Sequence, residues 1–236
     1  MKLKYKRVLI KFSGEALAGS KSFGLDFKAV RAIAKELVKL RKSGVDLAVV
    51  VGGGNIFRGR AIPRDTIDQA TADYMGMVGT IINALALQAE IEKEGGECRV
   101  LTALSMKEVA EDYIRRKATS HLSKGRIVLF AAGTGNPYFT TDTAAALRAL
   151  ETGAQVLLKA TTHVDGVYTA DPNKNKKAKK LARVSFQEAL EKHLKIMDST
   201  AFSLCQDNKL PIVVFKYSPG ALEKILRNEK VGTLVG

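Results

Sequence analysis

The chain alternates short, continuously apolar runs with longer segments of helical periodicity, and this alternation restricts its possible folds more than any other feature. Apolar residues occupy successive positions in these runs, which is typical of strands that helices cover on both faces. The runs are Arg7–Phe12, Asp46–Val51, Glu97–Thr102, Arg126–Ala131, Gln155–Lys159 and Pro211–Lys216. The pattern predicts an α/β fold, a three-layer α/β/α sandwich with a mostly parallel central sheet.

The segments between the runs carry the spacing and the end signals of helices. The first of them, from Asp26 to Ser43, has apolar residues on one face, Asp26 as a plausible N-cap and Gly44 after its end. Another opens with Ser105 and Glu108, which is the pattern of a capping box. The expected helices are Asp26–Ser43, Thr66–Glu94, Ser105–Lys117, Thr141–Leu150, Ser185–His193, Ser199–Asn208 and Ser218–Arg227.

The length of 236 residues suits one large α/β domain built from two closely packed lobes. We predict a single domain over residues 1–236, with one lobe at 1–153 and a second at 154–236. The first lobe holds most of the glycine-rich loops. Ligands of open parallel sheets bind beyond the carboxyl ends of the strands, so the crevice is expected where these loops emerge.

Composition argues against membrane and metal-centre classes. The apolar runs are far shorter than the roughly 20 residues that a membrane-spanning helix needs. The basic N-terminus leads directly into a strand, which makes a signal peptide an unfavoured interpretation. Cys98 and Cys205 lie far apart and have no zinc-binding spacing, so both are expected to be reduced thiols. We predict a cytoplasmic protein without a membrane partner or a protein-built metal site.

Three glycine-containing loops follow predicted strands and suit phosphate binding. Gly133–Asp142 follows the apolar run Ile127–Ala131 and leads into a helix. Val49–Asn55 runs into three glycines with Arg58 just beyond, and Lys11–Gly14 leaves the first strand with a lysine. Backbone N–H groups at such a loop, with a helix dipole behind them, favour an anion. Three loops of this kind suggest that two phosphorylated ligands meet, which points to phosphoryl transfer.

Two better-known nucleotide motifs do not fit. Gly14–Lys21 resembles a Walker A loop, but its serine and lysine stand in the wrong order. The dinucleotide pattern G-x-G-x-x-G would need glycine where Phe57 and Tyr138 stand.

The formal charge of +14 leaves a second class of function open. A basic protein can bind nucleic acid through its phosphates, or it can carry a solvated lysine-rich surface. Part of the charge lies in Lys174–Lys180, where no aromatic residue offers a surface for base stacking. We favour a solvated loop there and keep a basic nucleic-acid-binding regulator as an alternative.

Five segments occur in one order that resembles a known family. They are Lys11–Leu17, Gly52–Gly59, Asp73–Met77, Gly133–Asp142 and Val164–Pro172. Together they resemble the bacterial-type uridylate (UMP) kinases of the amino acid kinase family, over essentially the whole chain. The resemblance implies ATP + UMP → ADP + UDP, a step of de novo pyrimidine nucleotide biosynthesis, with Mg²⁺ held mainly by phosphates. It also implies an allosteric homohexamer activated by GTP and inhibited by UTP, with Ser20–Phe23 as a candidate effector segment.

The resemblance also assigns residues. Lys11 would touch the transferring phosphate, Arg58 would bridge phosphates, and Asp142 would orient Lys11 or the attacking phosphate; these three are the expected catalytic residues. Asp73 would accept hydrogen bonds from the ribose hydroxyls of UMP. The expected ATP-binding residues are Lys11, Phe12, Ser13, Gly14, Gly54, Arg58, Thr162, Tyr168 and Asp171. The expected UMP-binding residues are Gly53, Asp73, Thr134, Gly135, Asn136, Pro137, Tyr138, Phe139, Thr140 and Thr141.

Some positions depart from the family pattern. The stretch Thr161–His163 is one residue longer than expected before Val164, which leaves the assignment of Thr162 open by one position. Phe12 replaces an aliphatic residue, and Ser199 an apolar one. The nearest rival within the fold is an acylphosphate-forming amino acid or carbamate kinase, which should lack both Asp73 and the Gly133–Asp142 loop.

Overall fold

The computed structural model describes residues 3–59, 63, 65–172 and 174–236. Within these residues, nine strands form one sheet in the order β4-β3-β5-β2-β1-β6-β8-β9-β7. In chain order the elements are β1 Arg7–Phe12, α1 Gly14–Ala18, α2 Phe27–Lys42, β2 Asp46–Val51, α3 Gln69–Lys93, β3 Cys98–Thr102, β4 Glu111–Asp112, α4 Arg115–Ser123, β5 Ile127–Ala131, α5 Thr141–Thr152, β6 Leu157–Thr161, β7 Arg183–Val184, α6 Phe186–Glu191, α7 Ser199–Asp207, β8 Ile212–Lys216, α8 Ala221–Leu226 and β9 Thr233–Val235.

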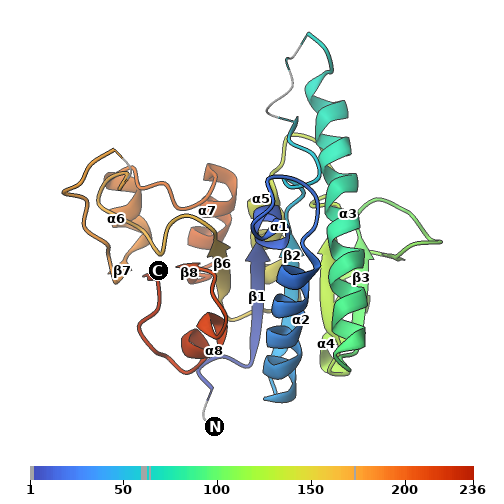
Figure 1. Ribbon diagram of the computed structural model, residues 1–236. Helices are drawn as coiled ribbons and strands as arrows, with labels where there is room; N and C mark the ends of the chain where they lie inside the picture. Colours follow the sequence, from blue (N-terminus) through green and yellow to red (C-terminus); the bar gives the residue numbers. More distant parts are fainter. Residues whose placement is uncertain (1–2, 60–62, 64, 173) are drawn as a thin grey trace.

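Helices cover both faces of the sheet. Figure 1 shows α2, α3 and α8 in front of the strands, with α4 and α5 behind them. Successive residues of β1 serve opposite faces: Val8 and Ile10 pack into the core under α2 and α3, whereas Leu9 packs into the core under α5 and α7. All three are fully buried. Burial on both faces explains why the strands are continuously apolar.

The predicted fold class is confirmed, because nearly all strand pairs among the described residues are parallel. The exception is β9, which runs antiparallel to β8. β1 and β2 have the predicted bounds, while β6 begins at Leu157 rather than at Gln155. The sheet continues through both predicted lobes, and the division after residue 153 stays a prediction. Among the described residues, none of the helices has the length and hydrophobicity that spanning a lipid bilayer requires.

The prediction of a helix over Ser105–Lys117 is wrong. After β3 the chain makes a turn in which the Val109 N–H donates to the Met106 carbonyl at 2.8 Å. Glu111 and Asp112 then form β4, which pairs with the end of β3, and α4 begins only at Arg115. Pairing with the open edge of the sheet satisfies backbone groups that the local capping pattern would have placed in a helix.

Candidate functional site

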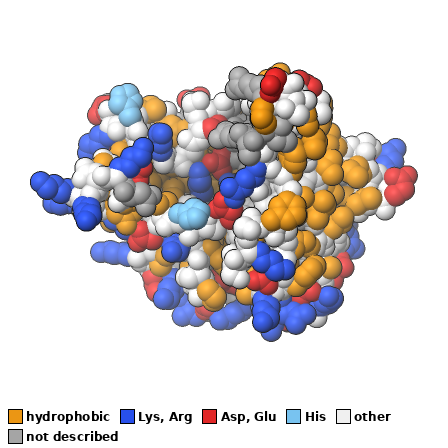
Figure 2. Space-filling model, turned by 45° about the horizontal axis from the view of Figure 1, so that its top comes forward, with side chains coloured by type: hydrophobic (Ala, Val, Ile, Leu, Met, Phe, Trp, Pro, Cys, Tyr) orange, Lys and Arg blue, Asp and Glu red, His pale blue; other side chains and the backbone are white. Residues whose placement is uncertain are grey.

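Four neighbouring strands, β5, β2, β1 and β6, end at the same edge of the sheet. The loops that follow them include the three glycine loops identified from the sequence. Figure 2 is turned so that this edge comes forward, and it shows Lys, Arg, Asp and Glu side chains gathered at the centre of the face. The candidate site is therefore built from residues at the carboxyl ends of these strands.

A cluster of three charged side chains lies at the centre of this edge. Lys11 on β1 and Lys159 on β6 occupy opposite positions of neighbouring strands. Asp142, in the first turn of α5, joins them: Lys11 Nζ lies 2.9 Å from Asp142 Oδ1, and Lys159 Nζ lies 2.6 Å from Asp142 Oδ2. Each of the three side chains is no more than 16% exposed. The cluster carries one net positive charge and faces the loops.

The environment fixes the ionisation of the cluster. Burial raises the pKa of Asp142, but the charges of Lys11 and Lys159 outweigh burial and hold that pKa below its usual value. Burial lowers the pKa of Lys159, and the attraction of Asp142 only partly opposes this effect. Asp142 is therefore an anion at neutral pH that keeps two buried ammonium groups together.

Hydrogen bonds from α7 hold the start of α5 that carries Asp142. Thr140 is the N-cap of α5 and accepts from the N–H groups of Asp142 and Thr143 at 3.1 and 3.2 Å. Asp198, the N-cap of α7, accepts in turn from the hydroxyls of Thr140 and Thr143. Neither Asp198 nor Lys159 was predicted as a site residue. Their partners lie 17 or more residues away in sequence, and only the fold brings them together.

A close contact with Asn55 explains the glycine at position 14, just after β1. A Cβ atom on Gly14 would lie 2.2 Å from Asn55 Oδ1, so the first loop has no room for a side chain there. Asn55 is buried and pairs with Asn83, which donates 2.7 Å to Asn55 Oδ1 and 2.6 Å to the Gly52 carbonyl. These buried amides fix the loop after β2, which contains Gly52, Gly53 and Gly54 and is called the glycine loop below, against α3.

The glycine loop and α3 form one wall of a cavity of about 160 Å³. A Cβ atom on Gly53 would meet the Gly76 carbonyl at 2.6 Å, which shows how closely loop and helix approach. The loop after β5 forms the other wall. The cavity brings together six residues expected to bind nucleotides, and it adds residues that the sequence did not suggest. The expected ones are Gly53, Gly54, Asp73, Thr134, Phe139 and Thr141, and the additions include Phe57, Gly76, Met77 and Thr80.

Asp73 connects α3 to the loop after β5. Its Oδ2 accepts from the backbone N–H of Tyr138 at 2.7 Å, and its Oδ1 accepts from Gln69 Nε2 at 2.8 Å. Tyr138 has a φ of +70° and a side chain that is 75% exposed. The structure does not place Gly135, Asn136, Pro137, Tyr138 or Thr140 on the cavity wall, although all five belong to the predicted UMP loop.

Arg58 and Thr162, which belong to different predicted lobes, meet at Glu15. Arg58 donates to the Gly54 carbonyl at 2.9 Å and pairs with Glu15 Oε1 at 2.7 Å. Glu15 Oε2 accepts from Thr162 Oγ1 at 2.8 Å and lies 3.2 Å from His163 Nε2. The hydrogen bond from Thr162, followed by the charge of Arg58, lowers the pKa of Glu15. Glu15 was not predicted as a site residue.

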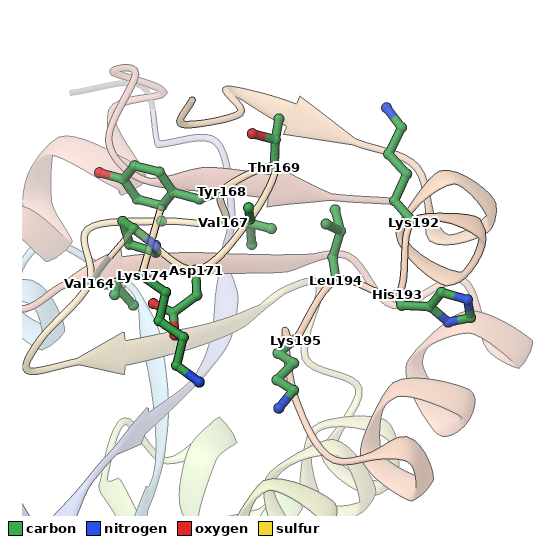
Figure 3. A pocket seen from close by; sticks show the side chains of 13 residues that line it. Val164, Val167, Tyr168, Thr169, Asp171, Lys174, Lys192, His193, Leu194 and Lys195 are labelled. Atoms are coloured by element: carbon green, nitrogen blue, oxygen red, sulfur yellow. The ribbon is translucent and has the colours of Figure 1, made fainter. Parts of the chain in front are cut away.

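A second cavity, of about 430 Å³, lies in the C-terminal part of the chain. Figure 3 shows the residues that line it. Tyr168 and Asp171, both expected to bind ATP, are among them, whereas Thr162 is not. Tyr168 donates to Asp165 Oδ1 at 2.7 Å. The opposite wall of this cavity consists of residues 192–195, between α6 and α7, and none of these residues was predicted from the sequence.

The two cavities adjoin the charged cluster through chain neighbours. Thr141 lines the first cavity and directly precedes Asp142. Lys195 lines the second cavity and directly precedes Ile196, whose carbonyl accepts from Lys159 Nζ at 2.7 Å. The arrangement therefore suits two ligands whose reacting groups meet at the cluster.

Two further predicted ATP-binding residues differ in their surroundings: Phe12, the last residue of β1, and Ser13, which follows it. Phe12 is fully buried and its ring packs edge-on against Tyr217 at 5.3 Å, so only its backbone is available to a ligand. The buried hydroxyl of Ser13 has no hydrogen-bond partner within the part of the chain that the structure describes. A buried hydroxyl beside Lys11 is suited to donate to a phosphate oxygen.

The carboxylates near the cluster are already engaged by protein groups. Asp142 is paired with two lysines, and Asp198 accepts from two threonines and from the Ala201 N–H. Across the described ranges, no group of three or more His, Cys, Asp or Glu is arranged to hold a metal ion. These engaged carboxylates fit a Mg²⁺ that is held mainly by the phosphate oxygens of a nucleotide.

Known proteins share this fold and this length. The pattern of the amino acid kinase family matches residues 6–216. The crystal structure of UMP kinase from Bacillus anthracis has a TM-score of 0.95 and 40% identity, covering 98% of this chain and 96% of that one. UMP kinase from Ureaplasma parvum has a TM-score of 0.93 and 36% identity, with complete coverage of both chains. Uridylate kinase from Archaeoglobus fulgidus has a TM-score of 0.76 and 27% identity, covering 97% of this chain and 99% of that one.

Proposed function

Since the chain belongs to the amino acid kinase family and is similar along its length to two UMP kinases, we propose that it transfers the γ-phosphate of ATP to UMP. The products are ADP and UDP, as in de novo pyrimidine nucleotide biosynthesis. The observation that carries this proposal is the Lys11–Asp142–Lys159 cluster, which adjoins both cavities at the strand ends.

We assign UMP to the cavity between α3 and the loop after β5. Asp73 lines this cavity, and a carboxylate can accept hydrogen bonds from both hydroxyls of a ribose. The start of α5 presents Thr141 to a phosphate, and its helix dipole favours the negative charge. The phosphate of UMP would then lie next to Asp142 and Lys11.

We assign the base and ribose of ATP to the cavity that Tyr168 and Asp171 line. Its triphosphate would extend to Lys11, Ser13 and the glycine loop, with Arg58 leaving Glu15 to contact phosphate oxygens. Mg²⁺ that arrives with ATP would be held mainly by the phosphates and would offset part of their negative charge. This placement agrees with an ATP-binding lobe at residues 154–236.

In the reaction, an oxygen of the UMP phosphate attacks the γ-phosphorus in line. The bond from that phosphorus to the β–γ bridging oxygen breaks, and ADP leaves with the electron pair. A phosphate monoester has a second pKa of about 6, so at neutral pH the nucleophile needs no general base. Lys11 and Lys159 stabilise the negative charge on the moving group, while Asp142 keeps the two ammonium groups in position.

The test is ADP formation from ATP and Mg²⁺ with UMP, CMP, dTMP, AMP, glutamate, aspartate or carbamate as acceptor. Turnover with UMP far above the others supports the proposal. Turnover with an acid alone would keep the fold and replace the substrate by that of an amino acid or carbamate kinase. A protein that turns over none of them and is retained on DNA in a salt-dependent manner would instead be a nucleic-acid-binding regulator.

The proposal extends to a homo-oligomer, which the family resemblance predicts to be a hexamer. Tyr74, Met75, Val78 and Ile82 on α3 are each 39–45% exposed and share one side of the helix. Figure 2 shows hydrophobic side chains gathered on the α3 side of the molecule. An apolar helix face of this kind suits a second copy of the chain. The effects of GTP and UTP, the effector role of Ser20–Phe23 and the cytoplasmic location stay predictions.

A further inference from the structure

The cavity assigned to the base of ATP carries more positive charge than a base requires. Three lysines line it: Lys174, Lys192 and Lys195. Lys192 is already paired, because its Nζ lies 2.5 Å from Glu188 Oε1. Lys195 is exposed and forms no ion pair with any residue that the structure describes. Its charge is available for a ligand.

Lys195 also occupies the junction between this cavity and the charged cluster. The next residue, Ile196, is buried, and its carbonyl accepts from Lys159 Nζ at 2.7 Å. The backbone around Lys195 is fixed, since the Leu194 N–H donates to the Ala189 carbonyl at 2.9 Å. In Figure 3 the side chains of Lys195 and Lys192 extend to opposite sides of the cavity.

The geometry points to Lys195 as a residue that binds the α- or β-phosphate of ATP and guides the triphosphate from the base cavity to the Lys11–Asp142–Lys159 cluster. This inference rests on the proposed ATP-dependent function. A nucleoside triphosphate must pass from the cavity to the cluster, and its negative charges need cations along that path. An ammonium group with three donors on a flexible stem is suited to that contact.

The test compares binding of ADP and of adenosine, because the two ligands differ in the phosphates that Lys195 is expected to contact. Lys195→Met should raise the Kd for ADP roughly tenfold to a hundredfold, as expected for the loss of one hydrogen bond to a charged group. It should leave the Kd for adenosine and the KM for UMP unchanged, and raise the KM for ATP. Lys195→Arg keeps the charge and should restore most of the affinity for ADP.

Two further lysine variants sharpen the comparison. Lys224 is exposed on α8, which Figure 1 shows at the end of the sheet opposite the candidate site. Lys224→Met should therefore bind ADP like the natural protein. Lys192→Met should weaken ADP binding less than Lys195→Met, because the ammonium of Lys192 is engaged by Glu188.

Three results would overturn the inference: unchanged ADP binding in Lys195→Met, an equal loss of ADP and adenosine binding, or an equal effect of Lys192→Met. If the natural protein converts UMP while Lys195→Met binds ADP normally, only this inference fails. If it converts no UMP but Lys195→Met weakens ADP binding alone, the proposed function fails and Lys195 remains a phosphate-binding residue.

Discussion

Replacing Asp142 by asparagine removes the negative charge that Lys11 and Lys159 share. Both ion pairs are short and nearly buried, with N–O distances of 2.9 and 2.6 Å. Breaking a buried pair by removing one partner typically costs 3–5 kcal/mol, because the remaining charge loses its compensation. We expect Asp142→Asn to lower the free energy of unfolding by about this amount at pH 7, and to lower kcat roughly a hundredfold.

The loss of stability should depend on pH in a defined way. The folded pKa of Asp142 is lowered, so its contribution is present above the unfolded value of about 3.9 and is lost as the pH falls through the folded pKa. The folded pKa of Lys159 is also lowered, so burial of its charged ammonium group reduces the stability of the folded protein below that pKa. This reduction becomes smaller as the pH rises toward the unfolded pKa of about 10.4. The difference in the free energy of unfolding between the natural protein and Asp142→Asn should therefore be greatest between the pH at which Asp142 gains a proton and the pH at which Lys159 loses one.

Urea unfolding of both proteins from pH 3 to pH 10, together with ADP formation at pH 7, measures these effects. Asp46→Asn is a matched control, because Asp46 also pairs with two basic groups, Arg7 at 3.0 Å and Arg41 at 3.6 Å. Those side chains are 24–27% exposed, and we expect a loss of about 1 kcal/mol. If Asp142→Asn lost no more stability than Asp46→Asn and kept its activity, the cluster would not hold the site together.

Three other perturbations test separate parts of the structure. Gly53→Ala should raise the KM for UMP about tenfold, because its Cβ would lie 2.6 Å from the Gly76 carbonyl; steady-state kinetics would show this. Burial raises the pKa of Glu36, so the stability of the natural protein relative to Glu36→Gln should be greatest in acid and decline as the pH rises through that pKa, as measured by urea unfolding. Val78→Glu should dissociate the proposed oligomer, which light scattering would report as a fall in mass.

The sequence predicted the strands well because each is buried on both faces. β1 and β2 follow continuous apolar runs, and their bounds agree with the prediction at both ends. The Ser105–Lys117 segment failed for the opposite reason. Its capping box is a local signal, and the edge of β3 offered Glu111 and Asp112 a pairing that the local signal could not anticipate. The two-residue strands β4 and β7 are too short to produce a periodic pattern at all.

The candidate site was predictable where its residues lie in glycine loops, and not where they act through distant partners. Glu15 follows the first glycine loop, but its contacts to Arg58 and Thr162 depend on how the loops after β2 and β6 fold over α1. Asp198 is the N-cap of α7. Nothing in its local sequence indicates that the same carboxylate holds the start of α5.

Lys159 shows most clearly why sheet register carries information that a motif lacks. In the sequence it is the last residue of a predicted strand, a place where an exposed lysine is unremarkable. In the fold it stands opposite Lys11 on the neighbouring strand, with its side chain on the face that α5 covers. Two facing lysines would repel each other without an anion between them, and the first turn of α5 supplies Asp142. The parallel pairing of β1 with β6 thus brings two unrelated strand lysines into the one positive charge that we propose binds phosphate. A change in that register by one residue would turn Lys159 to the opposite face and remove it from the site.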